Sequence, residues 1–320
     1  MVRAHLLLAD GHVQVDEGVT LAKNPAKGAT VWVDVIASSE LGLAALPPDW
    51  GFHPLALEDC VNRQRRAKFE RYPNHGFAVF QALDTGTDDL LDTSAICVFI
   101  QPGLVVSVHD RPLSAIDRVD RLVLQDTARL GIGSDRVIHA ILDAVVDEFL
   151  PLIRSWEDRL DVLAELASST GDDYDRAVVE ELVCIRRNLV NTRRIMLPQL
   201  EVVKRMRDSV PEAHPARHYY QDVVDHVEAI IETCQLCNEV CNGALQVHAD
   251  RSNERLNRVM KYLGIVSTML LPMTVISGVF GMNFDLIPTA HEPTGFWVAV
   301  GMMLVSATAL VGWFRYKHWL

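Results

Sequence analysis

Apolar and polar positions change their period about one third of the way along the chain. Up to about residue 112, short β-branched runs are separated by polar segments, which is typical of strands. The runs are TVWVDVIA from Thr30, FAVFQAL from Phe77 and ICVFIQPGLVVSVH from Ile96. Pro102-Gly103, inside the last run, indicates a hairpin turn, and HPLALEDC from His53 has a helical pattern. These elements predict a mixed α/β domain over residues 1–133.

From about Ser134 the apolar residues recur at three- and four-residue spacing, which predicts long helices over residues 134–260. A second helix is expected from about Tyr174 to Arg207, and Pro211 and Pro215 mark a turn after it. From Pro215 to Phe280 the only other proline is Pro272, so we expect one helix of about 65 residues. One small domain cannot cover such a helix. We therefore expect it to form a stalk that packs against copies of itself.

Two uncharged runs lie close to the C-terminal end of the sequence. Tyr262–Phe284 and Gly295–Phe314 each have the length of a helix that crosses a bilayer core of about 30 Å. We predict a first transmembrane helix over residues 261–284 and an external loop over 285–294. A second transmembrane helix over 295–314 and a basic cytoplasmic tail over 315–320 would follow.

Basic residues flank the two runs, whereas the loop between them has no Lys or Arg. The positive-inside rule therefore predicts a multi-pass protein of the inner (plasma) membrane with both termini in the cytoplasm. Trp297 and Trp313 lie near the ends of the second run, where aromatic belts form. The basic residues are Arg251, Arg255, Arg258 and Lys261 before the first run, and Arg315 and Lys317 after the second.

The charge and the motifs of the sequence exclude several classes of function. The chain has 30 Lys and Arg against 42 Asp and Glu, a net charge of −12, which argues against a nucleic-acid partner and favours cations. No Gly-rich phosphate loop or G-x-S-x-G motif is present, so we do not expect an enzyme. The six cysteines are irregularly spaced, which is unlike a secreted disulfide scaffold.

One face of the long helix carries small, polar or flexible residues at alternating steps of four and three. Such a stripe is typical of tight helix packing through small residues. It is also consistent with a face that lines a narrow aqueous path, with Met260 and Leu271 as apolar constrictions. A period near 3.5 residues favours a bundle of identical helices. The stripe comprises Asn253, Asn257, Met260, Gly264, Ser267, Leu271, Thr274, Gly278 and Gly281.

FGMNF follows a Pro-containing apolar run, and HPLALEDCVNRQRRAKFERY from His53 contains the pattern HP-x-x-LED. Together these motifs resemble those of the CorA family of divalent-cation transporters. YYQDVVDH from Tyr219 resembles its stalk, and KHWL its usual ending. The resemblance implies a homopentameric funnel. Its parts would be an α/β cytoplasmic domain, a long helical stalk and two C-terminal transmembrane helices.

The resemblance also implies a chemistry. Gly281, Met282 and Asn283 would form the selectivity filter, with a ring of Asn283 amides that hydrogen-bond a still-hydrated Mg²⁺. Gly281 would permit the turn that aims these groups, and Thr274 and Asn257 would offer further oxygens. The implied function is channel-like Mg²⁺ uptake, with Co²⁺ and Ni²⁺ as further substrates.

The resemblance further implies regulatory divalent ions, Mg²⁺ among them, at Glu58, Asp59, Asp143 and Asp222 between neighbouring subunits. Solvated surface acids are the alternative reading of these four residues. Two positions depart from the family pattern. Gln246 stands where some members have an acid in the stalk, and Thr289 stands where many have one in the external loop.

Two alternative functions stay open. A zinc transporter of the related ZntB branch would carry Zn²⁺, and a membrane-anchored cation sensor would bind ions without transporting them. Cys234, Cys237 and Cys241 share one helix face, which indicates either an apolar packing face or a soft-metal site.

Overall fold

The computed structural model describes residues 2–8, 12–18, 28–37, 43, 46–61, 66–84, 91–125, 133–168, 175–282 and 293–319. The chain divides into two compact units, Met1–Leu245 and Gln246–Leu320. We describe each unit separately.

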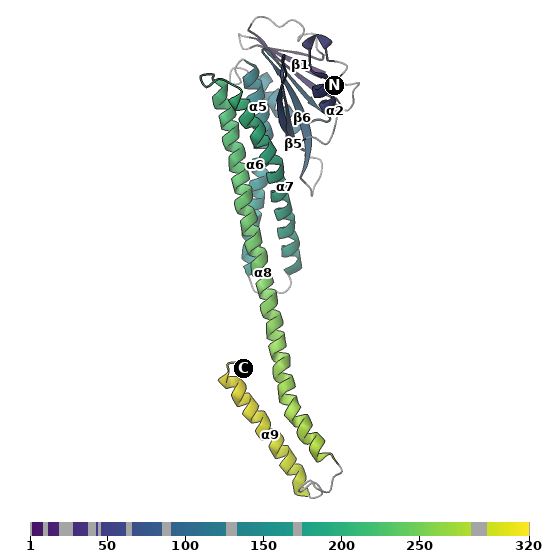
Figure 1. The fold of residues 1–320 in the computed structure, drawn as a ribbon, viewed down its shortest axis with the longest axis vertical. Helices are drawn as coiled ribbons and strands as arrows, with labels where there is room; N and C mark the ends of the chain where they lie inside the picture. Colours follow the sequence, from purple (N-terminus) through teal and green to yellow (C-terminus); the bar gives the residue numbers. More distant parts are fainter. Residues whose placement is uncertain are drawn as a thin grey trace. The chain divides into compact units, whose positions relative to one another are not determined.

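The first unit contains a sheet (Figure 1). Its seven described strands follow the order β2-β1-β3-β7-β6-β5-β4. Neighbouring strands are antiparallel except for β3 and β7, which are parallel. The β6–β7 hairpin turns at Pro102-Gly103 as the sequence predicts, and Gly103 has a φ of 79°, which favours glycine. The strands are β1 (Val2–Leu7), β2 (Val13–Asp16), β3 (Thr30–Ile36), β4 (Lys68–Arg71), β5 (Gly76–Asp84), β6 (Asp92–Gln101) and β7 (Leu104–His109).

Both faces of the sheet are covered, so its central strands are apolar on both sides. Along β5, Phe77 and Val79 enter one core while Ala78 and Phe80 enter the other. Helices α3 (Ser114–Gln125) and α5 (Ser134–Asp147) contribute to the second of these cores. The 3₁₀ helix η2 (Pro48–Trp50) and helix α2 (Pro54–Val61) lie with the first. This two-sided burial explains why the strands read as continuous apolar runs.

Long helices make up the rest of the first unit, side by side in Figure 1. They are α6 (Phe149–Ser168), α7 (Asp175–Asp208) and the N-terminal part of α8 (Ala216–Phe280). Helix α8 has 65 residues and passes through Pro272 without interruption, which confirms the single long helix predicted from the sequence.

The second unit contains the remainder of α8 and helix α9 (Pro293–Tyr316). Each helix has an 18-residue window that is strongly apolar, with mean hydropathy of 1.9 in α8 and 1.8 in α9. Only 6% and 11% of these windows are buried, unlike the core helices of soluble proteins. Both helices therefore have the length and surface of membrane spans.

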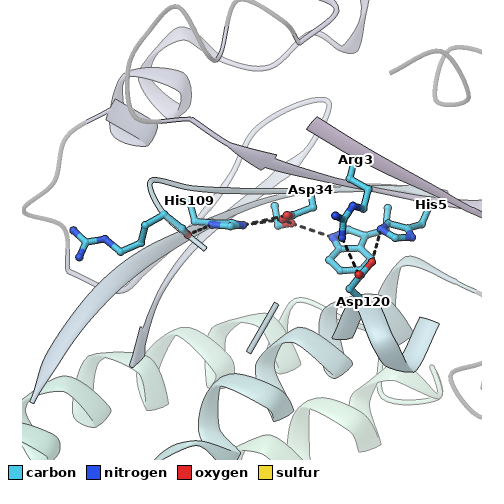
Figure 2. A network of polar contacts seen from close by, with 8 residues as sticks. Arg3, His5, Asp34, His109 and Asp120 are labelled. Atoms are coloured by element: carbon cyan, nitrogen blue, oxygen red, sulfur yellow. Dashed lines mark hydrogen bonds and ion pairs between the residues drawn. The ribbon is translucent and has the colours of Figure 1, made fainter. Parts of the chain in front are cut away.

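A buried polar network lies on the sheet face beneath α3 (Figure 2). Trp32 Nε1 donates to Ser107 Oγ over 3.0 Å, and Ser107 Oγ donates to Asp34 Oδ1 over 2.5 Å. His109 Nε2 lies 3.1 Å from the same carboxylate oxygen, and its Nδ1 lies 2.5 Å from the Arg111 carbonyl oxygen. With donors on both nitrogens, His109 bridges β7 to β3 as an imidazolium.

The neighbouring strand β1 extends this network to α3. Arg3 donates to Asp120 Oδ2 over 2.8 Å, and the other oxygen of Asp120 lies 3.0 Å from His5 Nε2 (Figure 2). His5 is fully buried and stacks on Trp32 at a centroid distance of 4.8 Å. Because burial outweighs the attraction of Asp120, the pKa of His5 is lowered.

The His109–Asp34 ion pair predicts a pH-dependent contribution to stability. Burial opposes the charged form of His109, but the hydrogen bond and charge of Asp34 outweigh it and raise the pKa of His109. The contribution is therefore complete below the unfolded pKa of about 6.5 and is lost as pH rises through the raised folded value. We expect His109→Gln to weaken the protection of β3 and β7 amides by about 1 kcal/mol at pH 6.

Hydrogen exchange of the full chain between pH 5.5 and 9 measures this effect, with His218→Gln, at an exposed position, as the control. The difference between His109→Gln and the unmodified protein should shrink at high pH. A difference that stays constant or grows with pH would contradict the ion pair.

Candidate cation path and cytoplasmic cation centre

The stripe on α8 identified in the sequence is exposed along the whole of its length within this chain. Its two large apolar members, Met260 and Leu271, are 69% and 66% exposed. The structure therefore gives the stripe no packing partner among the described residues of the same subunit. If small residues here serve tight helix packing, the helix they pack against belongs to another molecule.

The stripe points away from the side of α8 that is covered. The less exposed positions from Lys261 onwards recur at steps of three and four, with Met273 next to one of them, and so lie on one face. They are Lys261, Ile265, Met269, Pro272, Met273, Ile276 and Phe280. In the described part of the second unit, α9 is the only other helix, so α9 covers this face. Ser267 lies two residues after Ile265, about 200° around the helix at about 100° per residue. The stripe and α9 thus occupy opposite sides of α8.

Thr274 places a hydroxyl oxygen on the stripe in a defined orientation. Its Oγ1 donates to the Leu271 carbonyl oxygen over 2.8 Å. The proton is therefore engaged within the helix, and the oxygen lone pairs remain available as acceptors. Such an oxygen can accept hydrogen bonds from the water shell of a cation.

Gly281 lies in the turn that follows the last residue of α8, where a turn is expected from the sequence. Its N–H donates to the Ser277 carbonyl oxygen over 3.0 Å, and it is not among the residues with positive φ. A Cβ here would lie 3.1 Å from that same oxygen. This tight contact adds a second reason for a glycine at the turn, and the role of Gly281 in aiming the filter groups stays a prediction. Asn283 and Thr289 lie outside the described residues.

A second polar site lies between α5 and the first turns of α8. His139 Nε2 is 3.4 Å from Asp222 Oδ2, and His226 Nδ1 is 3.7 Å from Asp143 Oδ1. Asp147 lies one further turn along α5. Four-residue spacing on both helices places these side chains in facing rows. We call these five residues the cation centre.

The cation centre offers two overlapping sets of metal ligands. His139, Asp143 and Asp222 form one set, and Asp143, Asp147 and His226 form the other. In each set the ligand atoms all lie within 4.8 Å of one another. Asp143 belongs to both sets, so an ion in either position would contact it. One imidazole and two carboxylates suit Co²⁺ or Ni²⁺, and the carboxylates alone suit a partly hydrated Mg²⁺.

The electrostatics of the cation centre favour a cation. Burial and the neighbouring Asp147 raise the pKa of the Asp143 carboxyl. His226 Nδ1 is buried without a hydrogen-bond partner among the described residues. Arg118 compensates part of the negative charge, with its Nη1 3.4 Å from Asp147 Oδ2. A bound divalent ion would relieve the remaining repulsion and satisfy the open nitrogen.

The four acids implied by the resemblance separate into two places. Asp143 and Asp222 lie together in the cation centre, whereas Glu58 and Asp59 lie on α2 and belong to neither ligand set among the described residues. Asp59 Oδ2 is 2.5 Å from Lys68 Nζ, and Glu58 is exposed.

Sequence reasoning missed three members of the cation centre: His139, Asp147 and His226. The available signal was the four-residue spacing of His and Asp at 139, 143 and 147 and at 222 and 226. That spacing places each row on one helix face.

These features define the class of the protein. It is a helical membrane protein with two C-terminal spans, one of which presents a stripe of small and polar residues away from its partner helix. Its first unit holds carboxylates and imidazoles placed so that they could ligate a cation. This combination is that of a membrane transporter or channel for cations.

Comparison with known proteins identifies the family. The family described as "CorA-like Mg2+ transporter protein" matches residues 27–316, so the chain belongs to that family. The chain is therefore a divalent-cation transporter and not an enzyme, and the expected family, fold and membrane class are confirmed.

Individual relatives support the same family assignment. The chain is 30% identical to the "Putative metal ion transporter YfjQ" of Bacillus subtilis, over 91% of this chain and 90% of that protein. It is also 30% identical to the "Cobalt/magnesium transport protein CorA" of Thermotoga maritima, over 85% and 78% of the two chains. The solved structure of the CorA magnesium transporter from Methanocaldococcus jannaschii has the same fold, with a TM-score of 0.84 at 20% identity. That match covers 100% of this chain and 99% of the other.

The three cysteines that share one face of α8 are part of the hydrophobic core of the long helices. Cys234, Cys237 and Cys241 are buried and belong to the helical core. Burial raises the pKa of the Cys234 thiol to about 12 and that of Cys241 to about 11, and it also raises the pKa of Cys237. Thiolates, which react and bind soft metals, are therefore scarce at this face near neutral pH.

We expect iodoacetamide at pH 8 to label the exposed Cys184 quickly and these three buried cysteines only after denaturation. Mass spectrometry of the labelled peptides gives the rates. Labelling of Cys234 as fast as that of Cys184, or protection of the three thiols by added Zn²⁺, would favour the soft-metal alternative.

Proposed function

We propose that the chain forms a homopentamer in which the α8 helices surround one axis and conduct Mg²⁺ along the stripe, with Co²⁺ and Ni²⁺ as further substrates. The observation that supports this most strongly is the position of the stripe. It is exposed in the single chain and lies opposite the α9-facing side of α8. Five such helices would bury their stripes against a shared centre and leave α9 outside, towards lipid.

The chemistry of the stripe suits an ion that keeps its water. Mg²⁺ sheds water reluctantly, so neutral oxygens that hydrogen-bond its hydration shell can pass it without holding it. Thr274 and Asn257 supply such oxygens within the described stripe. The Asn283 amide would supply them in the filter formed with Gly281 and Met282. Met260 and Leu271 would narrow the path with apolar side chains that exclude water when the pore is closed.

The basic flanks of the two spans place both termini in the cytoplasm by the positive-inside rule. Residues 1–133 and 134–260 would then form the cytoplasmic domain and stalk, and 285–294 the external loop. An inside-negative potential drives uptake with about 4.6 kcal/mol per 100 mV for a divalent ion.

We propose further that the cation centre regulates the pore. A divalent ion at Asp143 would hold α5 against Asp222 and His226 of α8, the helix that also carries the stripe. High internal Mg²⁺ or Co²⁺ would thereby favour one position of α8, and loss of the ion would release it. Glu58 and Asp59 would contribute through a neighbouring subunit.

The alternatives can be separated by flux measurements. A zinc transporter of the ZntB type would carry Zn²⁺ and not Mg²⁺ into liposomes. A cation sensor would bind ions at the cation centre but show no flux of either.

Thr274 allows a matched test of the ion path. Thr308 on α9 is also exposed, and its hydroxyl likewise donates to its own helix, over 2.9 Å to the Leu304 carbonyl oxygen. We expect Thr274→Val to lower Mg²⁺ flux about fivefold, the equivalent of one hydrogen bond of about 1 kcal/mol to the hydrated ion. Thr308→Val should leave flux unchanged, and Asn283→Ala should abolish it. Equal effects of the two threonine variants in liposomes would rule out this path.

The cation centre can be tested by Co²⁺ binding to the purified protein, measured by calorimetry and visible absorption. Asp143→Asn should weaken binding at both positions about tenfold or more, since even partners of metal ligands contribute that much. Asp147→Asn should affect one position only, because Asp147 belongs to a single ligand set.

The control is Asp158→Asn, which removes one exposed acid from α6. The same three variants should shift the internal Mg²⁺ concentration that closes the pore in the same order. Regulation that is unchanged in Asp143→Asn would show that this centre does not control the pore.

A further inference from the structure

One end of the transmembrane hairpin brings basic residues of both helices to the same level. Lys261 of α8 donates from Nζ to the His318 carbonyl oxygen over 3.4 Å, so the backbone at His318 lies beside α8. Arg258 lies one turn before Lys261 on the same face of α8. Arg315 and Lys317 lie just before His318. We call Arg258, Lys261, Arg315 and Lys317 the basic collar.

The basic collar is not neutralised within the described part of this unit. The only acidic residues in the described part of the second unit are Asp250 and Glu254, and both precede the basic collar in sequence. Arg258, Arg315 and Lys317 are exposed, and none makes an ion pair with a described residue. Three of the four cationic side chains are thus exposed without an ion-pair partner among the described residues.

Aromatic side chains place the basic collar at the depth of lipid headgroups. Trp313 is 50% exposed and Tyr316 is 80% exposed, although both are large side chains at the end of an apolar span. Such rings settle at the boundary between hydrocarbon and water. A partner that meets them and the basic residues together has both an apolar part and an anionic part.

Residues 314–319 are also held together by contacts of their own. The Trp319 N–H donates to the Phe314 carbonyl oxygen over 2.8 Å, and the two rings stack at 5.8 Å with an interplanar angle of 15°. His318 adopts a φ of 55°, which turns the backbone so that its carbonyl meets Lys261. Phe314 is 1% exposed. Arg315 and Lys317 are therefore held at this end rather than carried on a loose tail.

We propose that the basic collar is a binding site for the phosphate headgroup of anionic phospholipids. Guanidinium groups pair with phosphate oxygens in a two-pronged geometry, and ammonium groups add charge. Arg258 comes from α8 and Arg315 from α9. One lipid, or adjacent lipids, held by both residues ties the stripe-bearing helix to its outer neighbour. The fold of this end thereby makes the hairpin sensitive to the charge of the surrounding membrane.

The test is a lipid titration of the full-length protein, followed by its thermal unfolding in detergent. Phosphatidylglycerol should raise the unfolding temperature at much lower concentration than phosphatidylcholine, and sodium chloride should suppress the difference. Arg258→Gln combined with Arg315→Gln should weaken the apparent phosphatidylglycerol affinity roughly 30-fold, since each basic residue near an anionic surface contributes about fivefold. The response to phosphatidylcholine should not change.

Two further variants act as controls. Arg186→Gln combined with Arg187→Gln removes two exposed arginines from α7 and should retain the full phosphatidylglycerol effect. Arg258→Lys combined with Arg315→Lys keeps the charge and should retain most of it, which separates loss of binding from damage to the fold.

Three results would overturn the proposal. Phosphatidylglycerol and phosphatidylcholine could stabilise the protein equally. The glutamine double variant could keep the phosphatidylglycerol effect. Glycerol 3-phosphate or inorganic phosphate could stabilise the protein as well as the lipid does, which would assign the collar to a soluble anion.

Discussion

A bilayer offers no partner to a polar side chain, and this constraint governs the second unit. Helix α8 is long and apolar enough to cross a membrane, yet one of its faces carries Asn257, Ser267 and Thr274. The other face is covered by α9, and the chain supplies nothing described to cover the polar face. Polar groups left towards hydrocarbon are costly, so this face must meet water or another subunit. Self-association around an aqueous centre satisfies both needs.

Polar side chains in the first unit are also removed from water, in this case by burial in a protein core. Its sheet is buried on both faces, so the polar side chains beneath α3 must pair with one another. Asp34 is shared by Ser107 and His109, and Asp120 by Arg3 and His5 (Figure 2). Even so, both ring nitrogens of His5 and Oδ1 of Asp120 lack a hydrogen-bond partner among the described residues, as does Nδ1 of His226 in the cation centre. The cation centre differs because its residues are partly exposed and each ligand set combines one imidazole with two carboxylates, a combination that suits an ion.

Local patterns in the sequence were sufficient to predict the helices and strands, but not to predict which of these elements lie next to one another. Proline positions and helical periodicity predicted α8, and the small-residue spacing identified its stripe. The cation centre required knowledge of which helices lie together, because His139 and Asp222 are 83 residues apart. The contact between Arg3 and Asp120 spans 117 residues for the same reason. Periodicity reports which face a residue occupies on its own element and carries no information about the element opposite.

Gly281 illustrates a second limit. The sequence suggested that it permits a backbone turn, and the structure has a turn there together with a site where a Cβ would lie 3.1 Å from the Ser277 carbonyl oxygen. Backbone freedom and a missing Cβ both favour glycine, and sequence alone does not distinguish them. Family resemblance helped with function, because FGMNF and HPLALEDC together indicated a cation transporter that the residue chemistry had left open.

The symmetry of the detergent-solubilised particle, determined by electron microscopy at a resolution that traces α8, tests the central claim most directly. The account predicts fivefold rotational symmetry, with Thr274 and Gly278 turned towards the axis and α9 on the outside. A monomer or dimer, or an assembly in which this face of α8 contacts lipid, would contradict it.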